Sequence, residues 1–168
     1  RKEYSGASKA IASLEKKGLV QRSEQRIYRT PMGARFKHYP RPQHLTNEQR
    51  AALEQILQAI DKRAYHPFLL HGVTGSGKTE VYLQAAEKAL ALSMGVLIIV
   101  PEIALATQLE AHLFSRFGDQ VALMHSGMSK AEKFDQFCRI LSGEAQVVIG
   151  ARSAVFAPLA NPGLIIVD

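Results

Sequence analysis

The chain of 168 residues is long enough for one domain of ordinary size and an appendage, because domains usually contain about 100 to 150 residues. Apolar residues make up 46% and charged residues 21% of it, a composition that excludes an intrinsically disordered protein. The longest apolar run, GVLIIVP at 95–101, is too short to cross a bilayer, and no charged start followed by an apolar stretch marks a signal peptide. We therefore expect a cytoplasmic protein with no membrane partner.

The formal net charge of +6 is concentrated at one end of the chain. Residues 1–44 contain eleven Lys or Arg and three Asp or Glu, whereas residues 45–168 contain ten and twelve. A basic segment joined to a nearly neutral domain indicates a polyanionic partner, most often nucleic acid. A basic arm that only keeps the protein soluble is the alternative.

Residues 1–30 are predicted to form a short helix and a hairpin. An apolar stripe that includes Ile11 and Leu14 predicts a helix from about Ser5 to Lys17, and Gly18 suits its left-handed stop. The alternating sequence LVQRSEQRIYRT at 19–30 predicts the hairpin. Together they resemble the recognition helix and wing of winged-helix domains, without the helices that usually precede them.

The cations of this first segment are candidates for contacts with DNA phosphates, which require clustered positive charge but carry no sequence specificity. The candidates are Lys9, Lys16, Lys17, Arg22, Arg26 and Arg29. The alternative is that the segment merely packs on the next domain. Residues 31–44, with three prolines and no helical or strand period, are predicted to be a linker.

From residue 45 onward, short apolar runs alternate with longer helical patterns. Strands are predicted at 68–71, 96–101, 121–125, 146–150 and 163–168, helices at about 78–93, 103–117 and 129–142, and an irregular loop at 151–162. Parallel strands need crossover connections, and strands buried on both faces are continuously apolar. This order therefore predicts an α/β fold with a parallel sheet.

A glycine-rich loop follows the first predicted strand. The sequence GVTGSGKT fits the phosphate-binding pattern G-x-x-x-x-G-K-[ST] in its expected place between a strand and a helix. Lys78 would reach the β- and γ-phosphates, and the Thr79 hydroxyl would bind Mg²⁺. The predicted nucleotide-binding residues of the loop are Gly72, Val73, Thr74, Gly75, Ser76, Gly77, Lys78 and Thr79.

Six segments carry a family resemblance: LTNEQ (45–49), GVTGSGKTEVYL (72–83), VPEIALATQ (100–108), MHSGMS (124–129), GARSAVFAP (150–158) and LIIVD (164–168). In this order they resemble superfamily 2 helicases, and most closely the family of primosomal protein N-prime, the bacterial replication restart helicases. The resemblance implies a RecA-like P-loop lobe over 45–168, with ATP and Mg²⁺ as cofactors. It also implies forked and single-stranded DNA at stalled replication forks as the substrate, and single-strand-binding protein and other primosome proteins as partners.

The resemblance assigns roles to further residues. Gln49 corresponds to the family's adenine-reading glutamine, and Lys78 and Asp168 to catalytic residues, with Asp168 and Thr79 holding Mg²⁺. The segments 101–103 and 150–153, the latter with Arg152 and Ser153, correspond to loops that contact single-stranded DNA. Independently of the family, Arg152 follows a strand end where open α/β sheets meet ligands, although a surface salt bridge is the alternative. His125 and Ser126 correspond to residues with a coupling or packing role.

Asp168 begins the family's Asp-Glu-Glu-His motif, Walker B, and is the last residue of this sequence. The sequence does not contain the following glutamate, the second motor lobe with its arginine, or the eight zinc-binding cysteines of the full-length family. We therefore expect weak nucleotide binding with scarcely any turnover, no zinc in this piece, and a chain end that is not a natural terminus. A P-loop kinase or metabolic ATPase, and a non-enzymatic winged-helix regulator, are the alternatives.

Overall fold

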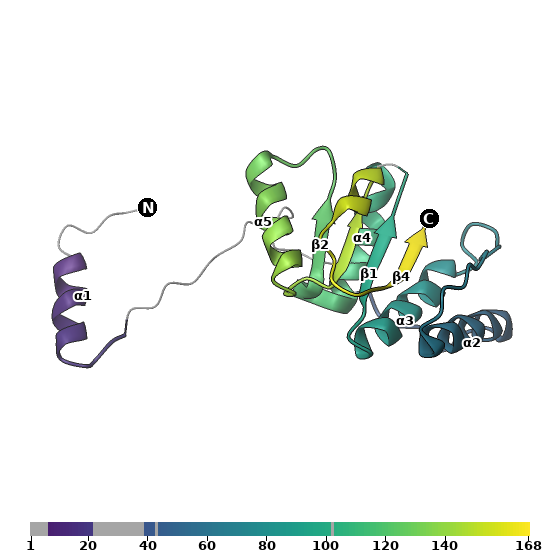
Figure 1. Ribbon diagram of the computed structural model, residues 1–168, viewed down its shortest axis with the longest axis horizontal. Helices are drawn as coiled ribbons and strands as arrows, with labels where there is room; N and C mark the ends of the chain where they lie inside the picture. The colour runs from purple at the N-terminus through teal and green to yellow at the C-terminus, as the bar shows by residue number, and fades with distance from the viewer. Residues whose placement is uncertain (1–6, 22–38, 43, 102) are drawn as a thin grey trace.

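The computed structural model describes residues 7–21, 39–42, 44–101 and 103–168 (Figure 1). Its helices are α1 (Ala7–Lys16), α2 (Asn47–Lys62), α3 (Lys78–Ala91), α4 (Ile103–Phe117) and α5 (Lys130–Leu141), with short 3₁₀ helices η1 (Gly118–Gln120) and η2 (Arg152–Phe156). Its strands are β1 (Gly95–Ile99), β2 (Val121–Met124), β3 (Val147–Gly150) and β4 (Pro162–Val167). In the described part of the chain, none of these helices is both long and apolar enough to span a membrane.

The four strands form one sheet in the order β2-β3-β1-β4, and every pair in it is parallel. Ile98 of β1 lies opposite Ile149 of β3, and Met124 of β2 lies opposite Gly150 of β3. Helices connect the strands along the chain, as parallel pairing requires. The predicted α/β class and parallel sheet are therefore confirmed, as are the helices predicted at 78–93, 103–117 and 129–142.

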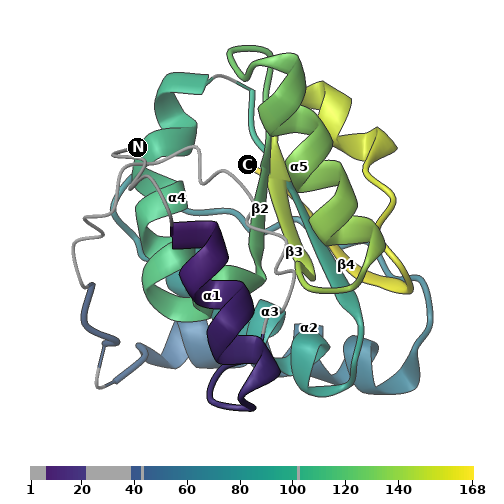
Figure 2. The ribbon, with the colours of Figure 1, turned by 90° about the vertical axis from the view of Figure 1, so that its left-hand side faces the viewer.

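Helices cover the two faces of the sheet, and the strand side chains alternate between them. On one face, Val96 and Ile98 belong to the core that α3 and α4 complete. On the other, Leu97 belongs to a smaller core with Ile140 of α5. Figure 2 shows the sheet between α4 and α5. Because both faces of β1, β2 and β3 are covered, these strands are continuously apolar, whereas β4 leaves Ile165 61% exposed.

The first turns of two helices are fixed by their own side chains. Thr46 precedes α2, its hydroxyl accepts from the Gln49 backbone N–H, and Gln49 Oε1 accepts from the Thr46 backbone N–H. Ser129 and Glu132 form the same reciprocal pair at the start of α5. Each capping box satisfies backbone donors that have no partner within the helix, so it sets where the helix begins.

The strand predicted at Phe68–His71 is wrong. Residues 64–73 form no helix or strand, and Leu69 is 91% exposed. In the described part of the chain β4 pairs only with β1, so no ladder hydrogen bonds join residues 68–71 to the sheet. An apolar run becomes a strand only when a neighbour supplies those bonds, which local sequence cannot report.

In the first quarter of the chain, the structure describes α1 and the turn after it. Gly18 has a left-handed φ of 69°, its N–H donates to Glu15 O, and the Leu19 N–H donates to Leu14 O. These two bonds are the Schellman arrangement, so the predicted helix and its glycine stop are confirmed. Most of the hairpin predicted at 19–30 lies outside the described residues. The division into a partial winged-helix segment (1–30), a linker (31–44) and a lobe (45–168) stays a prediction.

Gly150 is the last residue of β3 and is closely packed against β2. A Cβ atom there would collide with the Met124 carbonyl oxygen and approach the Ala154 Cβ to 2.9 Å. We expect Gly150→Ala to lower the free energy of unfolding by about 1–3 kcal/mol, because backbone atoms must move to accept the methyl group. Urea denaturation measures this as a lower midpoint, and an unchanged midpoint would contradict the packing described.

Candidate nucleotide-binding site

The glycine-rich loop leads directly into α3. Gly75 and Gly77 have φ values of 83° and 79°, which side chains other than glycine rarely adopt. The Ser76 backbone N–H donates to Val73 O at 3.1 Å, and a Cβ on Gly72 would lie 2.6 Å from Ser76 Oγ. The backbone is thus curled back on itself before a helix N-terminus, where N–H groups and the helix dipole favour anions.

Lys78, the first residue of α3, extends its side chain back over this loop. Its Nζ donates to Gly72 O at 2.8 Å and to Val73 O at 3.0 Å. The ammonium group is therefore held inside the curl of the loop by two carbonyl dipoles. A phosphate at the same place would offer it full negative charge, a stronger partner than a carbonyl group.

Gln49 connects the start of α2 to the loop. Besides its capping bond, its Nε2 donates to Ser76 O at 2.8 Å. A Cβ on Gly77 would collide with this Nε2, so only glycine at 77 lets the amide approach. Gln49 thus holds α2 against the loop. Its role in reading adenine stays a prediction.

The two predicted metal ligands meet at a third residue. The Tyr82 hydroxyl lies 3.2 Å from Thr79 Oγ1 and 3.2 Å from Asp168 Oδ2, while the Asp168 backbone N–H donates to Ile99 O at 3.0 Å. A hydroxyl and a carboxylate are ligands that Mg²⁺ accepts, with phosphates and water completing its shell. No cluster of three or more His, Cys, Asp or Glu occurs in the described part of the chain, and a nucleotide-bound Mg²⁺ needs none. These residues therefore fit the ion.

Burial raises the pKa of Tyr82 to about 12, an effect partly offset by its hydrogen bond with Thr79 and reinforced by the charge and hydrogen bond of Asp168. Only 7% of the residue is exposed. The phenol therefore stays protonated throughout the physiological pH range and always carries a proton to donate.

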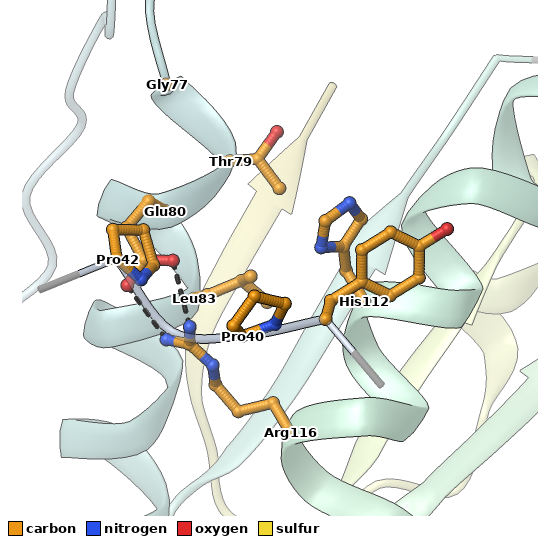
Figure 3. A pocket seen from close by; sticks show the side chains of 9 residues that line it. Pro40, Pro42, Gly77, Thr79, Glu80, Leu83, His112 and Arg116 are labelled. Carbon is orange, nitrogen blue, oxygen red and sulfur yellow. Dashed lines mark hydrogen bonds and ion pairs between the residues drawn. The ribbon is translucent and has the colours of Figure 1, made fainter. Parts of the chain in front are cut away.

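The first turn of α3 also borders a pocket of about 190 Å³ (Figure 3). Its lining residues are Tyr39, Pro40, Pro42, Gly77, Thr79, Glu80, Leu83, His112 and Arg116. Residues 39–42 lie across α4, where the Tyr39 backbone N–H donates to Ser115 Oγ at 2.9 Å and the Tyr39 and His112 rings are 4.0 Å apart. The predicted linker is thus docked on the lobe at its described end.

One ion pair spans this pocket from α4 to α3. Both Arg116 guanidinium nitrogens donate to the Glu80 carboxylate at 2.9 Å, and the two side chains are only 11% exposed (Figure 3). Glu87 lies two helical turns after Glu80 on α3. Its Oε1 is 3.7 Å from Nη1 of Arg116, and it also pairs with Arg41 of the docked segment. This network fixes α3, and with it Lys78, relative to α4.

The residues predicted to contact DNA are spread over the chain. Lys9 and Lys16 are exposed on α1, and Lys17 is exposed in the turn after it. Arg152 and Ser153 are exposed at the start of η2, which occupies part of the loop predicted at 151–162. Pro101, His125 and Ser126 follow β1 and β2 at the same carboxyl edge of the sheet. The buried Nδ1 of His125 has no hydrogen-bond partner among the described residues. Arg22, Arg26, Arg29 and Glu102 lie outside the described residues.

Residues 46–168 match the model of the DEAD/DEAH box helicase family. The match covers more than half of the chain and includes the loop at 72–79, α3 and all four strands of the sheet. The chain therefore belongs to the DEAD/DEAH box helicase family. This membership removes the alternative of a P-loop kinase or metabolic ATPase.

The chain is similar to curated proteins called replication restart protein PriA. It is 47% identical to that of Bacillus subtilis (strain 168) over 167 residues, 99% of this chain and 21% of the relative. It is 46% identical to that of Synechocystis over 165 residues, and 47% identical to that of Treponema pallidum over 124 residues; these matches cover 96% and 74% of this chain, and 19% and 18% of the relatives. The chain thus spans about a fifth of the length of these relatives, with the similarity to two of them extending into its basic first quarter.

Sequence reasoning missed three residues of this site: Glu80, Tyr82 and Arg116. A signal existed for Tyr82, because it is placed one turn after Thr79 on a helix whose neighbouring residues are apolar, and a buried tyrosine hydroxyl normally needs a partner. No local pattern identifies Arg116 as the partner of Glu80, since 36 residues separate them.

Proposed function

We propose that this chain is the nucleotide-binding half of an ATP-dependent DNA helicase or translocase that acts at stalled replication forks during replication restart and primosome assembly. The observation that carries the proposal is the loop at 72–79: it is curled around an ammonium group and leads into a helix of a DEAD/DEAH box lobe. Similarity to proteins called replication restart protein PriA over nearly the whole chain supports replication restart as the process.

In the proposed site, Lys78 exchanges its bonds to Gly72 O and Val73 O for phosphate oxygens of ATP. Thr79 and Asp168 would hold Mg²⁺, whose positive charge would offset the negative charge of the phosphates. Gln49, fixed beside Ser76, is placed next to the loop for contact with the base. Transfer of the phosphoryl group depends on positioning and electrostatics, which is why Lys78 and Asp168 count as catalytic residues.

The proposed DNA contacts divide between two surfaces. Exposed cations on α1 would contact phosphates of forked DNA, while Arg152 and Ser153 at the carboxyl edge of the sheet would contact the single strand. The resemblance to restart helicases extends the proposal to single-strand-binding protein and other primosome proteins as partners. A protein acting on the bacterial chromosome would work in the cytoplasm.

Charge reversal separates the DNA surface from the nucleotide site. We expect Lys16→Glu, Lys17→Glu and Arg22→Glu together to weaken binding of forked DNA about tenfold or more and to reduce its salt dependence, because each cation lost no longer displaces counterions from a phosphate. The matched control changes three exposed cations elsewhere, Arg50, Lys62 and Lys130, to glutamate and alters the net charge equally. Fluorescence anisotropy with forked DNA and a fluorescent ATP analogue measures both affinities. Equal losses in the two triple variants would leave α1 without a specific role.

A further inference from the structure

The Tyr82 hydroxyl joins the two metal-binding candidates, Thr79 on its own helix and Asp168, which lies 86 residues beyond Tyr82 in the sequence. Tyr82 lies on α3, its ring is packed in the main core, and 7% of the residue is exposed. Its hydroxyl lies within hydrogen-bond distance of Thr79 on its own helix and of Asp168 at the end of β4. The ring is therefore anchored while its polar tip contacts both groups.

Hydrogen-bond chemistry gives this contact a direction. A carboxylate can only accept, so the bond to Asp168 uses the single proton of the phenol. When that proton points at Asp168, the contact with Thr79 requires the threonine hydroxyl to donate to the phenol oxygen. The lone pairs of the threonine oxygen are then free to face a cation, and one oxygen of Asp168 is held in a fixed place.

Resting on the proposed function, we propose that Tyr82 is a positioning residue, which ties the Thr79 hydroxyl to the Asp168 carboxylate and so presets both oxygens for the Mg²⁺ of a bound nucleotide. Tyr82 itself does not contact the ion. A purely structural tyrosine would instead hold α3 against β4 and have no effect specific to Mg²⁺.

A Mg²⁺ titration distinguishes these two roles. Tyr82→Phe keeps the ring and removes only the hydroxyl, and Tyr65→Phe makes the same change at a residue that is 94% exposed. Binding of a fluorescent, non-hydrolysable ATP analogue is followed in EDTA and at increasing Mg²⁺ concentration. For Tyr82→Phe we expect the Mg²⁺ concentration that gives half of the maximal gain in analogue affinity to rise about three- to tenfold. The affinity for the analogue in EDTA should stay within about twofold of that of the parent chain. Tyr65→Phe should match the parent chain.

Parallel losses in EDTA and in Mg²⁺, or an unchanged Mg²⁺ midpoint, would overturn the positioning role. Failure of the parent chain to bind the analogue at all would instead contradict the proposed function. A second measurement tests the hydrogen bond between Tyr82 and Asp168 without nucleotide. The unfolding equilibrium constants of the parent chain, Tyr82→Phe, Asp168→Ala and the double variant form a double-mutant cycle. We expect the combined effect to be about threefold smaller than the product of the single effects. Effects that multiply independently would show that the two side chains are not linked.

Discussion

Lys78→Ala is expected to weaken nucleotide binding about 10- to 100-fold, the factor that corresponds to losing one charge-assisted hydrogen bond of about 1.5–3 kcal/mol. The ammonium group lies inside the loop at 72–79, bonded to two of its carbonyl oxygens, and alanine places no positive charge there. Titration with a fluorescent ATP analogue in the presence of Mg²⁺ measures the loss.

Lys88→Ala is the matched control for this substitution. It removes the same charge from the other end of the same helix, where Lys88 pairs with Asp61 of α2 at 2.7 Å. Both variants should bind forked DNA with an affinity within about twofold of that of the parent chain, because the contacts with DNA phosphates are proposed to lie elsewhere on the chain. Equal nucleotide affinities in the two lysine variants would remove Lys78 from the site and, with it, the main support for the proposed function.

Much of the nucleotide site could be predicted because its signals are local. The spacing from Gly72 to Thr79 dictates both the positive φ values of the loop and the helix start at Lys78, and these are properties of consecutive residues. The capping box at Thr46 and Gln49 is equally local, since both partners lie within four residues.

The interactions that could not be predicted join distant parts of the chain. Tyr82 approaches Asp168 only because β4 lies beside β1 in the sheet, an order that no periodicity reveals. The wrong strand at 68–71 has the same origin: Phe68 and Leu69 are as apolar as the buried strands, yet they are exposed, because among the residues that the structure describes no strand pairs with them. Local sequence patterns thus predicted most of the helices and strands, whereas the order in which the strands pair determined which distant residues are in contact.

The second large effect is expected for the ion pair that holds α3 on α4. Arg116→Ala should lower the free energy of unfolding by about 3–5 kcal/mol, because it leaves the Glu80 carboxylate buried at 11% exposure without its two guanidinium donors. At about 2–4 °C per kcal/mol for a chain of this size, the melting temperature should fall by about 6–20 °C. Thermal unfolding followed by circular dichroism measures the shift.

Arg50→Ala makes the same substitution at an exposed position of α2 and should change the melting temperature little. The double variant Glu80→Gln with Arg116→Met removes both charges and should recover part of the loss, since much of the cost comes from an unpaired buried charge and not from the missing attraction. If Arg116→Ala is no more destabilising than Arg50→Ala, the pair does not secure α3. Because Lys78 and Thr79 begin that helix, a loosened α3 should also weaken nucleotide binding, whereas the recovered double variant should restore it.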